Sequence, residues 1–318
     1  MQLTQRAKGL VFTLSGVALL IPDALALRLS GLENWNAVFW RSLLSGLMML
    51  AILLLLRRQQ RPAATMALGP TGIILTVFIT FSSIGFVLSL MYTSVANTLI
   101  ILALAPMFSA FYDRLFRQQR LALRTWLAIG CCLCGVAVLV ADGFNSGNQL
   151  GNVLALITAI MLGVEFSLMA SVPHQQIWPA LGLGYLVAAI VAALLSLLAA
   201  TSLSLTGANL IAVAAMGLVI IPFAFMLISQ GPRYLPAPEV AMLMMLETVC
   251  APFLVWMVLG EDPGRYALIG GALVIGTLVW HSALDLIQER RNLAKTALAA
   301  KTLAADQSTT TGEGTGSR

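Results

Sequence analysis

Long apolar segments, separated by short polar ones, run through most of the chain. Ten can be read, at residues 9–27, 35–56, 70–92, 95–113, 123–141, 151–170, 178–200, 207–229, 239–259 and 265–285. Their lengths approach or exceed the roughly 18–20 apolar residues that a helix needs to cross a bilayer. None alternates apolar and polar residues as a barrel strand does, and backbone in lipid must satisfy its own hydrogen bonds. The pattern predicts an all-α integral membrane protein with ten transmembrane helices.

The second half of the chain repeats features of the first half 142 residues later. Tyr92 opens the stretch YTSVANTLIILALAP, and Tyr234 opens YLPAPEVAMLMMLET. The same spacing separates Gly9 from Gly151. An odd number of predicted spans lies between each helix and its copy. The chain is therefore expected to form two inverted five-helix repeats, an architecture found in many secondary transporters.

Basic residues gather on one side of the predicted membrane. Of the 18 Lys and Arg residues, 15 fall in loops on the N-terminal side or in the C-terminal tail. By the positive-inside rule both termini are cytoplasmic, as an even number of spans requires. We expect a first repeat at 1–145, a second repeat at 146–287 and a disordered cytoplasmic tail at 288–318.

The first apolar segment also has the features of a signal peptide, because basic residues precede it and it ends in Ala24-Leu25-Ala26. Its match to the sixth predicted span at the repeat spacing favours a membrane helix instead. Removing it would also leave an odd number of spans.

Composition supports a membrane protein and narrows its chemistry. Hydrophobic residues make up 59% of the chain and charged residues 10%, whereas soluble proteins are about 25% charged. The net charge of +5 follows from the basic loops, so nucleic acid is not an expected partner. No HExxH, Walker or phosphate-binding glycine motif is present, so we expect no enzyme activity and no cofactor. The four cysteines lack zinc-ligand spacing, and no metal is expected.

Asp23 and Arg41 are charged residues inside apolar segments, where charge is costly. Asp23 follows Pro22 near the outer end of the first predicted helix. Arg41 lies about two turns into the second, at a similar depth, so the two could pair. One interpretation is a structural ion pair; the other is a substrate or proton site open to an outer cavity.

Glu165 and Glu247 are acids in the second half of the chain. Glu165 lies 142 residues after Asp23 and has no basic residue in its own span. Because an unpaired carboxyl in lipid would be protonated, Glu165 is expected to face a water-filled cavity and to suit proton coupling, or to be a satisfied structural group. Glu247 lies near the middle of the ninth span. Its counterpart position, Ala105, is beside Pro106, where a proline permits a helix break that could line a cavity. The residues expected to break a helix or line a cavity are Pro22, Pro106 and Thr248.

Asn97 and Glu239 also match at the repeat spacing, but both lie at predicted helix starts. Capping of the helix N-terminus is the simpler explanation of both.

Several segments resemble the EamA group of the drug/metabolite transporter superfamily. They are FWRSLLSGLMML (39–50), YTSVANTLIILALAPMF (92–108), RTWLAIGCCLCGVAVLV (124–140), GPRYLPAPEVAMLMMLETVCAP (231–252) and LGED (259–262). The resemblance implies ten helices around a central cavity, alternating access, and transport of a small metabolite, most often outward across a bacterial inner membrane. It also implies roles for Arg41, Glu247 and Glu261. The chain departs from the family pattern at Thr248, where many members have a proline, and at Gln119, where the first repeat usually has a glutamate.

The leading hypothesis is a secondary exporter of a small metabolite, an amino acid or a related amphipathic compound, with proton coupling as one option. Helices 1–4 and 6–9 would line the cavity. The alternatives are an uptake carrier on the same fold and a non-transporting membrane scaffold or receptor. The expected partners are a small-molecule substrate, the lipid bilayer and, as one option, a second copy of the chain in a homodimer.

Overall fold

The computed structural model describes residues 5–59, 68–118 and 149–260, with isolated residues between 123 and 134 and between 269 and 280. Within this part of the chain all regular structure is helical, and eight segments are long and apolar enough to cross a membrane. They are Gln5–Ser30, Asn34–Leu55, Pro70–Tyr92, Val95–Phe116, Gln149–Met169, His174–Leu198, Asn209–Arg233 and Glu239–Leu259. These are the predicted spans one to four and six to nine. The predicted spans 123–141 and 265–285 lie largely outside the described residues, and Gln119, Glu261 and the tail at 288–318 lie wholly outside them.

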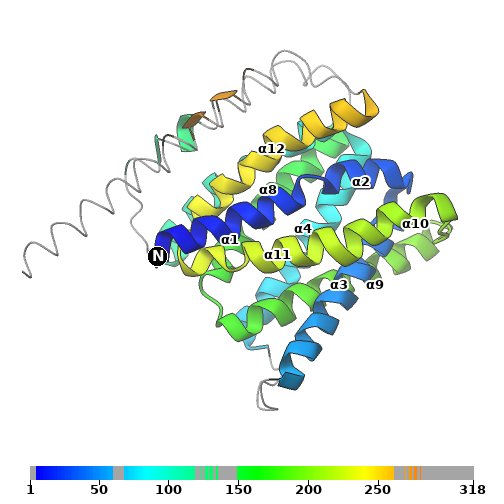
Figure 1. Cartoon of the computed structure of the whole chain (residues 1–318), viewed down its shortest axis with the longest axis horizontal. Coiled ribbons are helices and arrows are strands. Elements are labelled where there is room, and N and C mark those ends of the chain that lie inside the picture. Colours follow the sequence, from blue (N-terminus) through cyan, green and yellow to red (C-terminus); the bar gives the residue numbers. More distant parts are fainter. Residues whose placement is uncertain are drawn as a thin grey trace, which may run out of the picture.

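Five of the eight described spans are single helices, and three are divided into shorter elements (Figure 1). In chain order these are α1 (Gln5–Leu20), α2 (Asp23–Ser30), α3 (Asn34–Gln59), α4 (Pro70–Tyr92), α5 (Val95–Leu102), α6 (Ala105–Phe116), α8 (Gln149–Met169), α9 (His174–Leu198), α10 (Gly207–Ala214), the π-helix η1 (Ala215–Ile220), α11 (Ile221–Ile228), the 3-10 turn η2 (Gly231–Arg233) and α12 (Ala237–Leu259).

Prolines mark the places where three spans depart from a regular helix. The first span turns at Pro22 and resumes as α2, and the fourth is interrupted before Pro106, which is the second residue of α6. In the eighth span, the wide π-turn η1 ends just before Pro222. A proline has no N–H to donate and its ring clashes with the carbonyl four residues earlier, which favours a break in the preceding turn. α9 and α12 nevertheless continue through Pro179 and Pro252. α12 also continues through Thr248 without a break.

The expectation that Asn97 and Glu239 are N-caps is wrong. Ser94 caps α5 by accepting a hydrogen bond from the Asn97 backbone N–H at 3.1 Å. Glu239 lies in the first turn of α12, and its Oε2 pairs with Arg6 Nη2 at 2.7 Å. α5 begins at Val95, as predicted, and α12 begins at Ala237, two residues earlier than predicted. Asn97 and Glu239 therefore lie inside the first turn of their helices, where the helix dipole favours the carboxylate of Glu239.

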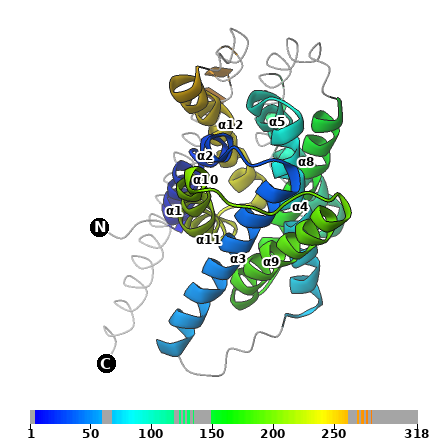
Figure 2. The same cartoon turned by 90° about the vertical axis from the view of Figure 1, so that its right-hand side faces the viewer.

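The two halves of the chain interlock. α1 packs on α11, and its counterpart in the second half, α8, packs on α4. α3 packs along α9 (Figure 2), and α12 contacts α5 and α6. Each of these pairs joins a helix of the first half to a helix of the second half. The core is therefore made from both halves, and the space between them lies at the centre of the bundle.

Two glycines allow equivalent close contacts between the halves. A Cβ at Gly9 would lie 2.7 Å from the Cβ of Tyr234, and a Cβ at Gly151 would lie 2.7 Å from the backbone of Tyr92 and from the Cβ of Thr93. Separations this short exclude any side chain unless the backbone moves. The 142-residue spacing seen in the sequence thus corresponds to a repeated contact, in which the first helix of each half meets the tyrosine turn of the other half.

Candidate functional site

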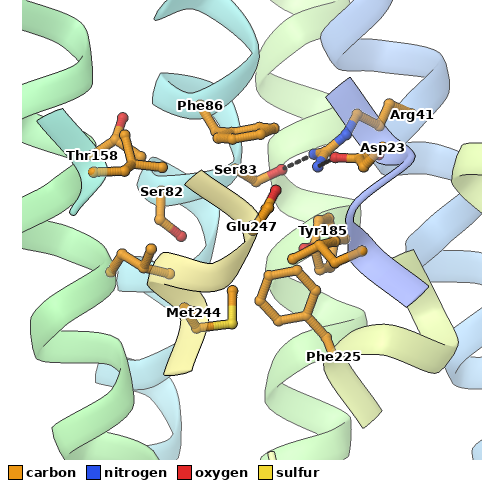
Figure 3. A pocket seen from close by; sticks show the side chains of 13 residues that line it. Asp23, Arg41, Ser82, Ser83, Phe86, Thr158, Tyr185, Phe225, Met244 and Glu247 are labelled. Carbon is orange, nitrogen blue, oxygen red and sulfur yellow. Dashed lines mark hydrogen bonds and ion pairs between the residues drawn. The ribbon is translucent and has the colours of Figure 1, made fainter. Parts of the chain in front are cut away.

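Three charged residues of the spans, Asp23, Arg41 and Glu247, line one cavity of about 40 Å³ (Figure 3). All eight described spans contribute to its wall. The lining residues are Leu20, Asp23, Arg41, Ser82, Ser83, Phe86, Leu102, Thr158, Leu162, Tyr185, Phe225, Met244 and Glu247. One water needs roughly 10–15 Å³, so the cavity has room for about three waters. It is far smaller than the roughly 300–1,000 Å³ of a typical ligand pocket.

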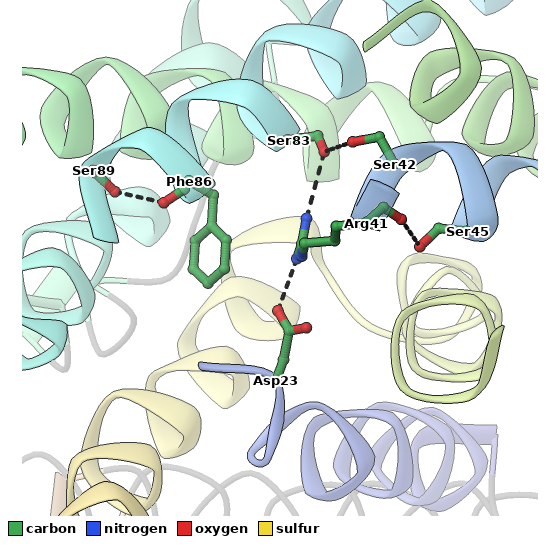
Figure 4. Close-up of polar contacts among 7 residues, drawn as sticks. All are labelled: Asp23, Arg41, Ser42, Ser45, Ser83, Phe86 and Ser89. Carbon is green, nitrogen blue, oxygen red and sulfur yellow. Dashed lines mark hydrogen bonds and ion pairs between the residues drawn. The ribbon is translucent and has the colours of Figure 1, made fainter. Parts of the chain in front are cut away.

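An ion pair between Arg41 and Asp23 forms one side of the cavity (Figure 4). Arg41 Nη2 donates to Asp23 Oδ2 at 2.7 Å, and the two side chains are only 3% and 0% exposed. The break at Pro22 makes Asp23 the first residue of α2, where the helix dipole favours a negative charge. The contact expected from the sequence is therefore present.

The guanidinium of Arg41 has further partners. Its Nη1 donates to Ser83 Oγ at 3.5 Å, and its Cζ lies 5.1 Å from the centroid of the Phe86 ring, within cation–π range. Ser83 Oγ also lies 3.3 Å from Ser42 Oγ. Arg41 Nε and Asp23 Oδ1 are buried without a hydrogen-bond partner among the described residues. The pair is thus held in place but retains one unused donor and one unused acceptor.

Glu247 projects from α12 into the same cavity, near the middle of the side chains drawn in Figure 3. It is 6% exposed, and its Oε1 has no hydrogen-bond partner within the described part of the chain. A buried polar atom without a partner is costly, and such atoms are uncommon in folded proteins. Glu247 is therefore an acceptor that the protein itself leaves open.

Glu165 lies behind the cavity wall rather than in it. It is 1% exposed and accepts a hydrogen bond from Ser82 Oγ to its Oε2 at 2.7 Å. Ser82 lines the cavity, whereas Glu165 does not. The structure therefore places one hydroxyl group between this carboxyl and the cavity that the sequence led us to expect it would face.

The three residues expected to break helices or line cavities lie close to this centre. Pro22 and Pro106 set the helix breaks, but neither lines the central cavity. Thr248 lines a second, smaller cavity of about 20 Å³, which Glu247 also lines. Thr248 Oγ1 donates to the Leu99 carbonyl at 3.3 Å, a contact that joins α12 to the broken fourth span.

Sequence reasoning missed most of the uncharged wall. Ser82, Phe86, Tyr185 and Phe225 all line the cavity. Hydroxyl and aromatic residues are common in apolar helices and do not stand out as charges do. The adjacent hydroxyls Ser82 and Ser83, in the middle of a span, were the signal that could have found part of this wall.

The described residues hold no group of three or more His, Cys, Asp or Glu side chains placed to bind a metal ion.

Apolar spanning helices around a buried, charged cavity define a multi-pass membrane protein, and they are consistent with a carrier of small molecules. The model of the EamA-like transporter family matches residues 9–141 and 149–282. The chain therefore belongs to the EamA-like transporter family, within the drug/metabolite transporter superfamily.

The fold is also similar to solved structures. One, described only as the crystal structure of a protein, is 18% identical and has a TM-score of 0.71; the match covers 88% of this chain and 98% of the other. At this identity the likeness shows the fold alone. A comparison with curated proteins finds no match.

Proposed function

We propose that this protein is a secondary active transporter that exports a small metabolite, an amino acid or a related amphipathic compound. It would act by alternating access across a bacterial inner membrane, with both termini cytoplasmic. The observation that carries the proposal is the enclosed cavity where Arg41, Asp23 and Glu247 meet and to which all eight described spans contribute. Secondary transporters bind their substrates at such a junction between halves, near the middle of the membrane.

Close contacts between the halves support alternating access. Three consecutive spans lie between Gly9 and Tyr92, so the Gly9–Tyr234 contact and the Gly151–Tyr92 contact belong to opposite ends of the bundle. With both contacts made, the small volume of the central cavity is consistent with an occluded state. Separating one contact at a time would open the cavity to one side of the membrane and then to the other.

The test of the proposal is the Glu247→Gln variant in proteoliposomes. It removes the negative charge with little change in volume, so we expect folding to be retained and transport to be abolished. Glu33→Gln is the matched control, because Glu33 is exposed and does not line the cavity. Unchanged flux in Glu247→Gln would remove this residue from the mechanism.

Proton coupling would use Glu165 or Asp23. Glu165 is buried with a single neutral donor, Ser82, and that donor lines the cavity. A proton on Glu165 could therefore be exchanged with water in the cavity through one hydroxyl. Transport that is indifferent to an imposed pH gradient would count against coupling.

Two other functions are separated from export by simple measurements. An uptake carrier would move substrate in the opposite direction, which labelled flux in vesicles of known orientation would reveal. A scaffold or receptor would give no counterflow of any labelled compound. Counterflow by the purified protein would exclude the scaffold and leave only the direction to be determined.

A further inference from the structure

The cavity contains more negative than positive groups. Asp23, Arg41 and Glu247 line it, and Glu165 lies one hydrogen bond behind Ser82. The ion pair at 2.7 Å balances Asp23 against Arg41. Among the described residues no basic side chain forms an ion pair with Glu247, so no partner there offsets the cost of burying its charged form. A buried charge without a partner is unfavourable, and a cation in the cavity would relieve that cost.

The unused hydrogen-bonding atoms point to the same kind of ligand. Among the described residues that line the cavity, Asp23 Oδ1 and Glu247 Oε1 are buried acceptors without partners, against one such donor, Arg41 Nε. An ammonium group carries three donors and no acceptor. It could therefore bond both open carboxyl oxygens at once.

A carboxylate group on a substrate would have fewer available hydrogen-bond donors in the cavity than an ammonium group would have acceptors. Arg41 already contacts Asp23 through Nη2, Ser83 through Nη1 and the Phe86 ring through its face. To form a bidentate pair with Arg41, a carboxylate would have to displace Asp23 and would then lie in the same small cavity as Glu247. Repulsion between like charges in a desolvated site opposes that arrangement.

The remainder of the wall is largely apolar and would contact a flat or aliphatic body once the cavity widens, because its present volume of about 40 Å³ holds only waters. Tyr185 and Phe225 meet edge to face with ring centroids 6.1 Å apart, and Met244 lies beside them in Figure 3. Aromatic faces attract cations, and a thioether adapts to different apolar shapes.

We propose that the cavity selects small amines, recognised by a positively charged nitrogen at Glu247 and Asp23, and that a carboxylate on the substrate is not required. The inference rests on the proposed transport function and narrows its substrate class to cations with an apolar body.

The experiment compares three probes that share one phenyl body: 2-phenylethylamine, phenylalanine and 3-phenylpropionate. Binding to the purified full-length protein in detergent is measured by calorimetry. We expect the amine to bind at least about tenfold more tightly than the amino acid, and the acid without a nitrogen not to bind. Glu247→Gln should weaken binding of the amine by tenfold or more, Glu247→Asp should restore part of it, and Glu33→Gln should leave it unchanged.

The amine proposal is overturned if phenylalanine binds more tightly than the amine, if no probe binds, or if Glu247→Gln keeps wild-type affinity for the amine. The comparison of probes on the wild-type protein holds even where a variant fails to fold. Counterflow in proteoliposomes separates the two proposals. If an amino acid shows counterflow and no amine binds, the proposal that the cavity selects amines is overturned, and the proposal that the protein is a transporter stands. If an amine binds but no compound shows counterflow, the amine site is supported and the transport function is contradicted.

Discussion

The Arg41–Asp23 pair is buried where neither charge reaches bulk water. Removing one member of a buried pair leaves the other uncompensated, at a cost of about 3–5 kcal/mol. We therefore predict that Arg41→Gln lowers the stability of the detergent-solubilised protein by this amount, while the double variant Asp23→Asn/Arg41→Gln recovers most of it. Thermal unfolding of the four proteins in the cycle measures the coupling, and additive effects would show that the pair is not a unit.

Ser82 is the donor between Glu165 and the cavity. Ser82→Ala should remove that connection and cost about 1–3 kcal/mol, because the buried carboxyl loses its partner. If the hydroxyl relays protons, the variant should also lose most of the stimulation of flux by an imposed pH gradient.

Ser89→Ala in the same helix is the control for Ser82→Ala. The Ser89 hydroxyl is likewise buried but bonds only to the Phe86 carbonyl among the described groups. Equal pH stimulation in wild type, Ser82→Ala and Ser89→Ala would exclude the relay.

At this scale the sequence identified charges and missed their partners. Asp23, Arg41 and Glu247 are visible because charge is rare in an apolar span. That Ser82 shields Glu165, or that Phe86 lies against Arg41, depends on the rotation of each helix about its axis. The sequence of an apolar span gives little information about this rotation, because lipid and the protein core accept the same apolar residues.

At the scale of elements, Pro106 prevents α5 and α6 from forming one helix, because its ring would clash with the carbonyl of Leu102. Pro106→Ala removes this clash. We predict that the span becomes more regular and moves Leu102 away from the cavity that it lines, so that flux falls several-fold while the protein still folds.

The measurement is flux in proteoliposomes, with size-exclusion profiles to establish folding. Pro62→Ala is a control for proline loss in a loop predicted from the sequence. Wild-type flux in Pro106→Ala would show that this break is not needed for the cavity.

The sequence predicted the positions of the eight described spans and the breaks near Pro22 and Pro106 well, because length and proline act locally. It did not predict the π-turn η1 or the Ser94 cap. The π-turn depends on how the preceding turn adjusts to a proline, and the cap depends on the residue at which the helix starts. Both are decided by tertiary packing.

At the scale of the whole molecule, Gly9 and Gly151 make equivalent contacts at the two ends. A leucine at either position should force its contact apart. Overpacking costs about 1–3 kcal/mol, which corresponds to a shift in population of about 5- to 150-fold between two states. We predict that Gly9→Leu favours opening toward the cytoplasm and that Gly151→Leu favours opening to the outside.

The measurement uses Phe225→Cys, a cavity position, in a background without the native cysteines. A membrane-impermeant thiol reagent, added to right-side-out or inside-out vesicles, should label the two leucine variants from opposite sides. Labelling from the same side in both variants would contradict the assignment of the contacts to opposite ends.

The sequence predicted the repeat, but it did not predict which helix of the other half each helix packs against. That α1 lies on α11, and α8 on α4, follows from the shape of surfaces in three dimensions. The repeat matches of Gly9 with Gly151 and of Tyr92 with Tyr234 gave only an indirect clue to it.

The interlocked halves also have a consequence for biogenesis. The chain is made from its N-terminus, and both members of the Arg41–Asp23 pair are in the first half, so these charges can neutralise each other as soon as the second span has been inserted. When Glu165 arrives, its donor Ser82 is already in the bilayer. Glu247 is inserted after these partners have met. During synthesis, Arg41 therefore does not remain for long in lipid without its partner Asp23. The order of synthesis therefore brings in last the acid that the finished protein leaves open.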